Sequence, residues 1–249
     1  MGVLDGLVAV VTGGGSGIGL AACHAFLREG ASVAALDVSP LELGSERALA
    51  VKADVSDQAS MDAAMAVVAE RFGGIDILVN NAGVSAVGTV EDNPDGEWAR
   101  VLDINVTGIV RGSKAALPYL RRSAHAAIVN TSSIAATAGL AKRALYSASK
   151  GAVHALTLAM AADLVADGVR VNAVSPGTAD TPWVARLLAR TDDPPGERRK
   201  LEERQPIGRM VSAQEVAAAM LYLVSPAASA TTGTCLAVDG GVGGLRLVR

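Results

Sequence analysis

The segment YSASK at positions 146–150 places a phenol and an ammonium four residues apart. Residues at this spacing share one face of a helix, with Cβ atoms roughly 5–6 Å apart, so the Lys150 ammonium could lie beside the Tyr146 hydroxyl. A phenol with a reference pKa of about 10 is a poor acid or base at neutral pH, but a nearby cation lowers that pKa. Tyr146 is therefore a candidate proton-transfer group, although such pairs also occur on the exposed faces of unrelated helices.

A second candidate site follows the apolar run Leu7–Thr12, where the glycines of TGGGSGIG precede a helical stretch. Glycines let the backbone approach a pyrophosphate, whose charge is favoured by the free N–H groups and positive end of the next helix. The spacing of Gly13, Gly17 and Gly19 differs from the common G-x-G-x-x-G. A glycine-rich turn that only packs a helix against a strand therefore stays an alternative.

Asp37 ends the next β-rich run, eighteen positions after Gly19. At this place an acidic side chain can bond the ribose 2′-hydroxyl of NAD and repel the 2′-phosphate of NADP. No Lys or Arg occupies the glycine loop or the two positions after Asp37. The pattern predicts NAD as the cofactor, with a strand-end Asp that caps the next turn as the alternative.

The elements that must position these residues alternate between short β-branched runs and longer Ala-rich helical runs. This alternation, without a Pro/Ser-rich linker, predicts one α/β domain over residues 1–249: a doubly wound parallel sheet with helices on both faces. The segment Pro176–Pro206 breaks the rhythm with RTDDPPGERRK, which predicts a surface excursion around 178–206 that serves as a substrate lid. The expected strands are Leu7–Thr12, Ser32–Asp37, Ala48–Ala53, Ile75–Asn80, Ala126–Ser132, Arg170–Ser175 and Thr234–Val238, and the expected helices are 17–29, 58–72, 95–122, 144–166 and 213–225.

Composition limits the classes of partner. The 249 residues are half hydrophobic but only 3% aromatic, which suits a core of Ala, Val, Leu and Ile between helices and a parallel sheet. The net charge is −3, and the densest basic cluster, GERRK, contains a Glu, so nucleic acid is not an expected partner. His24, His125 and His154 lack ligand-like spacing, so no metal site is predicted.

Cysteine use and hydropathy predict a compartment. Cys23 and Cys235 are too few for a disulfide framework, which suits a reducing environment. No apolar stretch reaches roughly 18 residues, and the N-terminus lacks the basic region of an export signal. We therefore expect a soluble cytoplasmic protein without a membrane partner.

These residues belong to a wider set of motifs that resembles the short-chain dehydrogenase/reductase family along the whole chain. The motifs are, in family order, TGGGSGIG (12–19), ADV (53–55), NNAG (80–83), DINVTG (103–108), SS (132–133), YSASK (146–150), PGTADT (176–181) and VDGG (238–241). The resemblance implies a Rossmann-type fold with strand order 3-2-1-4-5-6-7, usually in a homotetramer. It argues strongly against the exposed-pair interpretation of Tyr146 and Lys150.

The resemblance also implies which residues bind the cofactor. Asp54 and Val55 would contact the adenine, Asn81 and Gly83 would border its ribose, and Thr181 would bond the carboxamide. Pro176, Gly177 and Thr178 would form the wall of the nicotinamide pocket. The whole implied cofactor set is Gly13, Ser16, Gly17, Ile18, Gly19, Asp37, Asp54, Val55, Asn81, Ala82, Gly83, Tyr146, Lys150, Pro176, Gly177, Thr178 and Thr181.

The catalytic set that the resemblance implies is Asn105, Ser133, Tyr146 and Lys150. Ser133 is preferred to Ser132 because it stands thirteen residues before Tyr146, the spacing usual in the family. Lys150 and the positive nicotinamide ring of NAD⁺ would favour tyrosinate, so Tyr146 would take the proton of a substrate alcohol as hydride leaves the same carbon. Ser133 would hold the substrate oxygen, and Asn105 would hold a water that links Lys150 to solvent.

Within the family, the closer resemblance is to cytosolic 3-hydroxybutyrate dehydrogenases and bacterial sugar-acid dehydrogenases such as 2-keto-3-deoxy-L-fuconate dehydrogenase, through PGTADTP and a later RQPIGR. Those enzymes gather arginines around a substrate carboxylate. The matching residues are Arg143 and Arg204, with Arg186 one residue out of register, and Trp183 is a further candidate for the pocket wall. The resemblance thus implies an NAD-dependent dehydrogenase (EC 1.1.1.-) of a small hydroxycarboxylate or sugar acid.

Three alternatives stay open. A dehydrogenase of a neutral sugar or secondary alcohol would use the same catalytic set. A 3-oxoacyl-carrier-protein reductase typically uses NADPH, which the acidic Asp37 opposes. A non-catalytic NAD-binding protein would not need a working Tyr146 and Lys150.

Overall fold

The computed structural model describes residues 2–189 and 191–246, and its centre is a parallel sheet of seven strands. The strand order is β3-β2-β1-β4-β5-β6-β9, which confirms the predicted order, with β9 as the seventh strand of the sheet. Every strand pair in this sheet is parallel. The strands are β1 (Val8–Thr12), β2 (Ser32–Asp37), β3 (Ala48–Lys52), β4 (Ile77–Asn80), β5 (Ala127–Thr131), β6 (Arg170–Pro176) and β9 (Cys235–Val238).

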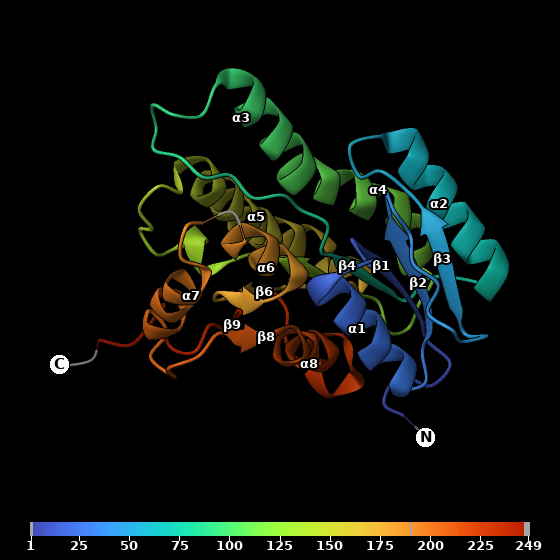
Figure 1. The fold of residues 1–249 in the computed structure, drawn as a ribbon. Helices are drawn as coiled ribbons and strands as arrows, with labels where there is room; N and C mark the ends of the chain where they lie inside the picture. The colour runs from blue at the N-terminus through green and yellow to red at the C-terminus, as the bar shows by residue number, and fades with distance from the viewer. Residues whose placement is uncertain (1, 190, 247–249) are drawn as a thin grey trace.

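Helices cover both faces of the sheet (Figure 1). Alternate residues of β1 face opposite helical layers: Ala9 and Val11 pack in the cluster that includes α1 and α8, whereas Val8 and Val10 pack against α2, α4 and α5. Apolar side chains on both faces of a strand are typical of a buried parallel sheet. These helices are α1 (Gly17–Arg28), α2 (Gln58–Phe72), α4 (Gly108–Leu120), α5 (Ala144–Leu164) and α8 (Ala213–Val224), and short 3₁₀ turns occur at Ile134–Ala136, Val165–Asp167 and Pro226–Ala228.

The helical stretch predicted over residues 95–122 contains a π-helical turn. It consists of α3 (Asp95–Leu102), the π-helical turn (Asp103–Thr107) and α4, which follow one another without a gap, so the predicted helical stretch is confirmed except for the form of its middle turn. A π-helical turn widens the helix locally and is often found at functional sites. Asn105 lies in the middle of this turn and is buried.

The segment predicted as a surface excursion contains regular structure. It holds β7 (Ala179–Asp180), α6 (Pro182–Leu188) and α7 (Pro194–Glu203), and β7 pairs with β8 (Val211–Ser212) outside the main sheet. Both helices begin with proline at the first helical position, where its missing N–H is not needed. The prolines that suggested an irregular segment therefore start helices instead.

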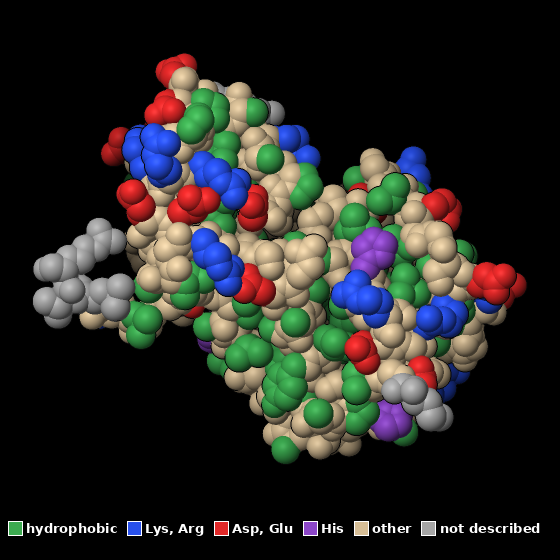
Figure 2. Space-filling model, turned by 60° about the horizontal axis from the view of Figure 1, so that its bottom comes forward, with side chains coloured by type: hydrophobic (Ala, Val, Ile, Leu, Met, Phe, Trp, Pro, Cys, Tyr) green, Lys and Arg blue, Asp and Glu red, His purple; other side chains and the backbone are tan. Residues whose placement is uncertain are grey.

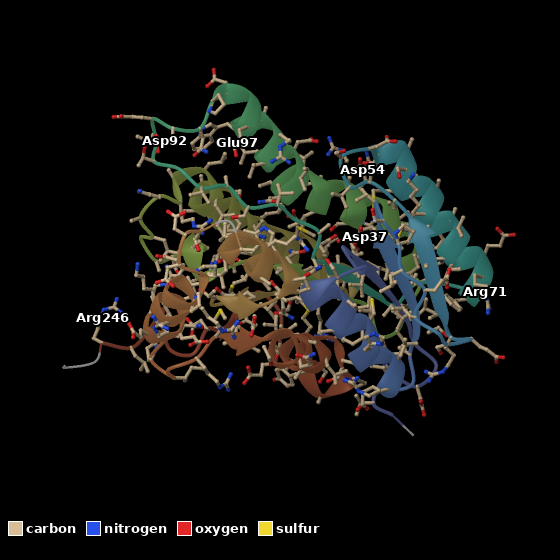
Figure 3. All side chains as sticks on the ribbon, viewed as in Figure 1. Asp37, Asp54, Arg71, Asp92, Glu97 and Arg246 are labelled. Atoms are coloured by element: carbon tan, nitrogen blue, oxygen red, sulfur yellow. The ribbon has the colours of Figure 1, made fainter. Side chains whose placement is uncertain are left out.

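The reversal of strand order lies between β1 and β4, which pair with each other while β2 continues on the other side of β1. Ligands of open parallel sheets bind at the carboxyl ends of the strands beside such a reversal. Asp37 and Asp54 lie at this edge, whereas Arg71 lies at the far end of α2 (Figure 3). Among the described residues, none of the helices is long and apolar enough to cross a membrane.

Candidate active site

The loop between β1 and α1 is tied to the end of β4. The Thr12 hydroxyl accepts hydrogen bonds from the backbone N–H groups of Asn81 (3.0 Å) and Ala82 (3.1 Å), and the Asn81 amide donates back to the carbonyls of Thr12 and Gly13. The two strand ends on either side of the reversal in strand order are therefore held together. This arrangement forms one wall of a crevice.

Glycine is needed at different positions of this loop for different structural reasons. Gly13 and Gly17 adopt φ values of 64° and 53°, which side-chain-bearing residues rarely adopt. A Cβ at Gly19 would overlap the Gly13 carbonyl oxygen, so this glycine permits close packing of α1 against the loop. Gly19, which the sequence analysis placed among the cofactor contacts, does not line the crevice. In the structure it allows α1 to pack closely against the loop.

The first turn of α1 has free backbone donors. Ser16 is the N-cap residue, and its side chain makes no capping hydrogen bond. A helix N-terminus without a side-chain cap offers N–H groups and a positive dipole end to an anion. The loop therefore has the structure needed to bind a phosphate.

Asp37 closes the other side of this loop. Its carboxylate accepts hydrogen bonds from the Gly15 N–H and the Ser39 N–H, each at 3.0 Å. A Cβ at Gly15 would lie 3.0 Å from that carboxylate, so the loop and Asp37 need a glycine between them. The carboxylate is thereby held at the carboxyl end of β2 beside the glycine loop.

A cavity of about 400 Å³ runs along this edge. It joins the glycine loop and Asp37 to Tyr146 and Lys150, so most of the predicted cofactor residues come together here, whereas Pro176, Gly177 and Thr178 line a second, smaller cavity. A dinucleotide fits this cavity. The backbone N–H groups of the glycine loop can bind its phosphates, and the Asp37 carboxylate and the Tyr146–Lys150 pair lie elsewhere along the same cavity. Its lining residues are Gly13, Ser16, Gly17, Ile18, Leu36, Asp37, Val38, Ala53, Asp54, Val55, Asn81, Ala82, Gly83, Val84, Ser85, Ile104, Thr131, Tyr146, Lys150, Thr181, Pro182 and Trp183.

Lys150 is buried at the inner end of this cavity, with 5% of its surface exposed. Its Nζ donates a hydrogen bond to the Thr131 carbonyl (2.7 Å) and lies 5.8 Å from the centroid of the Tyr146 ring. Burial lowers the pKa of the Lys150 ammonium to about 8. The two residues thus lie side by side on the first turns of α5, as their spacing predicts.

The pKa of the Tyr146 hydroxyl is not lowered. Burial raises the pKa of Tyr146, while a hydrogen bond with Ser133 and the charge of Arg143 act in the opposite direction. From the sequence, Lys150 and a bound nicotinamide were expected to lower the pKa of Tyr146. The structure adds Arg143 as a second cation beside the phenol.

The two candidate serines have different partners. The Ser133 hydroxyl bonds Tyr146 and accepts from the Ala135 N–H at 3.2 Å, at the start of a 3₁₀ turn. The Ser132 hydroxyl donates to the Lys150 carbonyl at 3.3 Å. Ser133 is therefore the serine whose hydroxyl contacts the phenol.

Asn105 is fully buried and makes three side-chain hydrogen bonds. Its amide oxygen accepts from the Val84 N–H (2.8 Å), and its amide nitrogen donates to the Val84 carbonyl (2.8 Å) and the Ser149 hydroxyl (3.1 Å). Ser149 in turn donates to the Tyr146 carbonyl. The Asn105 side chain thus joins the π-helical turn to α5 and to residues after β4, while its predicted role in holding a water stays a prediction.

A second cavity of about 180 Å³ opens on the other side of Tyr146, under α6 and α7. Arg143 and Arg204 both line it. The Arg143 guanidinium donates to the Ser85 hydroxyl (3.0 Å) and the Ala86 carbonyl (3.1 Å). The lining residues are Ile18, Ser85, Thr131, Ser132, Ser133, Ile134, Leu140, Arg143, Tyr146, Pro176, Gly177, Thr178, Ala179, Thr181, Trp183, Val184, Leu187, Leu201 and Arg204.

Of the two remaining predicted substrate residues, only one lies at the cavities. Trp183 lines both cavities, whereas Arg186 is exposed and lines neither of them. The structure therefore does not bring Arg186 to the site, because α6 presents Val184 and Leu187 to the cavity instead. Among the described residues, no three His, Cys, Asp or Glu side chains gather in a way that could hold a metal ion.

Sequence reasoning did not assign a role to Ser85 or Ser149. Ser149 lies inside YSASK, but the motif alone does not indicate that its hydroxyl meets the Asn105 amide. Ser85 carries no comparable signal, since it reaches Arg143 only because residues 84–88 pass the start of α5.

Comparison with known proteins gives matches to a family model and to a relative. Residues 13–243 match a family model described as enoyl-(acyl carrier protein) reductase. Cis-4-hydroxycyclohexanecarboxylate dehydrogenase of Sinomonas cyclohexanicum is 42% identical over 243 residues, which is 94% of this chain and 95% of that protein.

Two solved structures are also similar. Aldohexose dehydrogenase of Thermoplasma acidophilum in ligand-free form has a TM-score of 0.92 and 35% identity, covering 99% of this chain and 97% of that one. 3-ketoacyl-(acyl-carrier-protein) reductase of Brucella melitensis complexed with NADH has a TM-score of 0.88 and 33% identity, covering 96% and 99%.

Proposed function

The chain belongs to the short-chain dehydrogenase/reductase family, and we propose that it oxidises a small hydroxycarboxylate or sugar acid with NAD as its cofactor. Its class is that of an oxidoreductase acting on secondary alcohols (EC 1.1.1.-) with a nicotinamide dinucleotide. The observation that carries the finer proposal is the cavity in which Arg143 and Arg204 lie together with Ser133 and Tyr146.

The preference for NAD is supported by charge. Asp37 would meet the adenosine ribose at the end of β2, where its carboxylate can accept a hydroxyl but repels a phosphate. Lys150 is the only cation that lines the larger cavity among the described residues, and it lies beside Tyr146 rather than beside Asp37. No basic side chain of that lining is therefore placed to hold a 2′-phosphate. When bound, the dinucleotide would supply the hydride acceptor.

The proton chemistry is assigned to residues of this chain. Ser133 would bond the substrate oxygen and keep it next to the Tyr146 hydroxyl, with which Ser133 already makes a hydrogen bond. Tyr146 in its phenolate form would accept the hydroxyl proton. Lys150 would stabilise that phenolate from the cofactor side, and Asn105 would fix the helix turns that hold both residues.

The two arginines would bind the acid group. A guanidinium can hold a carboxylate through two parallel hydrogen bonds, and such charge-assisted bonds are stronger than neutral ones. Arg204 donates to the Thr178 hydroxyl at 3.1 Å, so it is turned toward the wall of the smaller cavity. Burial lowers the pKa of Arg143, and the positive charge of Arg204 acts in the same direction, so the two guanidinium groups are close enough to repel each other. A substrate anion between them would relieve this repulsion.

The resemblance to 3-hydroxybutyrate and sugar-acid dehydrogenases supports the same substrate class. The name of the Sinomonas relative also contains a hydroxycarboxylate. A neutral sugar is the second candidate, because the Thermoplasma structure is of an aldohexose dehydrogenase and Arg204 is exposed. A reductase of carrier-bound acyl groups is favoured less, since Asp37 opposes NADPH.

The proposal is tested by NAD⁺ reduction with a panel of hydroxy acids, their methyl esters and amides, and neutral sugars. We expect at least one hydroxy acid to be oxidised with a kcat/KM about ten- to a hundredfold above that of its ester, the value of one desolvated charge-assisted contact. Equal rates on acid and ester, or activity confined to neutral sugars, would contradict the proposed acid substrate and favour a neutral sugar.

A homotetramer is proposed on family resemblance. The exposed positions of α5 include Ala155, Leu158 and Ala159, and those of α8 include Ala218 and Tyr222, so both helices expose small or apolar side chains. Figure 2, which brings the lower side of Figure 1 forward, shows mostly uncharged side chains across the middle of that side. Light scattering of wild-type protein and Leu158→Glu would test whether the α5 surface is buried between subunits.

A further inference from the structure

Arg143 is held against residues 84–88 immediately before α5 begins. The Gly88 N–H donates to the Lys142 carbonyl (2.9 Å), and the Ala144 N–H donates to the Gly88 carbonyl (3.3 Å), so backbone bonds flank Arg143 on both sides. Its guanidinium is fixed by Ser85 and Ala86 at the wall of the smaller cavity. The charge of Arg143 therefore has a defined position relative to Tyr146, one helical turn further along.

The backbone at this point is strained. Lys142 has a φ of 56° and is, in the part of the chain that the structure describes, the only residue other than glycine with a positive φ. Such a conformation persists only where the surrounding contacts over-determine it, and here those contacts are the hydrogen bonds with Gly88. The strained turn directs the next residue, Arg143, toward the cavity.

Arg143 has no acidic partner. None of the ion pairs among the described residues includes it, although it is partly buried. It is also the N-cap residue of α5, where the positive end of the helix dipole opposes a cation. Desolvation lowers the pKa of its guanidinium. A cation kept in such a place interacts strongly with any negative charge that develops beside it.

The charged groups around Tyr146 are few. Among the described residues that line the two cavities, they are Asp37, Asp54, Arg143, Lys150 and Arg204. The two carboxylates lie at the ends of β2 and β3, away from the phenol, and Arg204 faces Arg143 from the lid. Only Arg143 and the Ser133 hydrogen bond counteract the effect of burial on the pKa of Tyr146.

Lys150 cannot replace Arg143 at alkaline pH. Its pKa of about 8 means that it loses its charge in the range where a tyrosine begins to ionise, whereas a guanidinium remains charged. Its Nζ is also directed to the Thr131 carbonyl. Arg143 is therefore the cation whose charge beside Tyr146 persists over the working pH range.

From this geometry, and resting on the proposed function, we propose that Arg143 is a positioning residue for proton transfer: its fixed guanidinium stabilises the phenolate form of Tyr146. The same residue can also anchor an anionic substrate, so the two roles must be separated. A neutral secondary alcohol separates them, because it has no carboxylate for Arg143 to bind.

The experiment measures kcat and kcat/KM for oxidation of a neutral secondary alcohol against pH, in wild type, Arg143→Met, Arg143→Lys and Arg204→Met. Oxidation needs the phenolate, so a weaker stabilisation of phenolate moves the acidic limb of the profile to higher pH. We expect this limb to rise by about one pH unit in Arg143→Met, to return most of the way in Arg143→Lys, and to stay in place in Arg204→Met. At high pH the Met variant should approach the wild-type rate.

A second readout does not depend on turnover. The ultraviolet absorbance of tyrosinate is followed against pH, and the difference between each protein and the same protein with Tyr146→Phe isolates the titration of Tyr146. Its midpoint should rise by about one unit in Arg143→Met and by less in Ser85→Ala, which removes one of the two bonds to the guanidinium.

An unchanged acidic limb and an unchanged titration midpoint in Arg143→Met would overturn the inference, whatever the loss of rate. Equal shifts in Arg143→Met and Arg204→Met would also overturn it, since they would reflect general positive charge. Failure of the acid-over-ester preference would overturn only the proposed substrate class. The phenol titration would still decide the role of Arg143.

Discussion

The two halves of the site are built in different ways. The cofactor half, from the glycine loop to Asp37, is held by hydrogen bonds in which backbone groups take part, at the ends of buried strands. The substrate half, under α6 and α7, is held by side chains such as Arg198 and Arg204 that lie at the surface. The first is part of the sheet, and the second is attached to it.

This difference explains how one fold can keep its cofactor while its substrate changes. Backbone contacts depend on glycines and on strand positions, so they admit few substitutions. Side-chain contacts at an exposed helix can be exchanged without disturbing the sheet. Tyr146 lies where the two halves meet, since it lines both cavities. Substitutions in each half should therefore separate cofactor effects from substrate effects.

The largest effect is expected at the meeting point. Tyr146→Phe removes the proton acceptor but keeps the ring, so we expect kcat to fall by about 10²- to 10⁴-fold while the Kd for NAD changes little. Steady-state kinetics measure the first quantity, and quenching or calorimetric titration with NAD measures the second. A Phe variant with close to wild-type turnover would show that another group takes the proton.

How much of the site was predictable follows the same division. The places of Gly13, Asp37 and Lys150 at the edge of the sheet could be predicted from sequence, because each belongs to a short motif on a strand end or a helix turn. The contact of Arg143 with Ser85 and that of Asn105 with Val84 could not, since they depend on how residues 84–88 pass over α5 and the π-helical turn. The raised pKa of Tyr146 also required the structure, because burial is its main cause.

The fold shows the same limit. Alternating β-rich and helical runs predicted the seven strands and their positions, and the family resemblance added their order. The helices of residues 182–188 and 194–203 were not predicted, because their composition resembles that of a loop. Capping by Thr181 and Asp193, together with proline at the first helical position, makes these short helices possible.

The second prediction tests the cofactor half. Asp37→Ala should raise the KM for NAD about ten- to a hundredfold, the value of a hydrogen bond to a charged group, and should improve use of NADP by removing repulsion of its phosphate. The ratio of kcat/KM for the two cofactors is the measurement. Because Asp37 also accepts from the Gly15 and Ser39 N–H groups, Asp37→Asn serves as the control that keeps a side-chain acceptor without the charge. A wild-type preference for NADP would refute the assignment.

The third prediction tests the substrate half. Arg204→Met should raise the KM for a hydroxy acid by about tenfold and leave the KM for a neutral alcohol and for NAD nearly unchanged. The effect is placed at the lower end because Arg204 is exposed and water weakens its contacts. Arg186→Met is the matched control, since Arg186 is an exposed arginine of the same segment outside both cavities. Equal effects of the two variants would mean that overall charge, not a contact of Arg204, attracts the substrate.

The smallest effect is expected at the ion pair that joins α7 to β7. The guanidinium of Arg198 on α7 donates to the Asp180 carboxylate at 2.6 and 3.4 Å, and Asp180 immediately precedes Thr181 at the start of α6. The pair is exposed, so we expect Arg198→Met to lower the free energy of unfolding by less than about 1 kcal/mol, or a Tm shift of roughly 2–4 °C at most.

A contact of this kind can still affect the substrate half, because α7 leads directly to Arg204. We expect Arg198→Met to raise the KM for the acid a few-fold and to leave the Kd for NAD unchanged. Added salt should reduce the difference between variant and wild type, since it already weakens the exposed pair in the wild type. Lys200→Met is the control, because Lys200 pairs with Glu197 within α7 and makes no contact with β7 through that pair. A loss of NAD affinity in Arg198→Met would mean that the segment of α6 and α7 also holds the cofactor, so that the two halves of the site are less separate than their construction indicates.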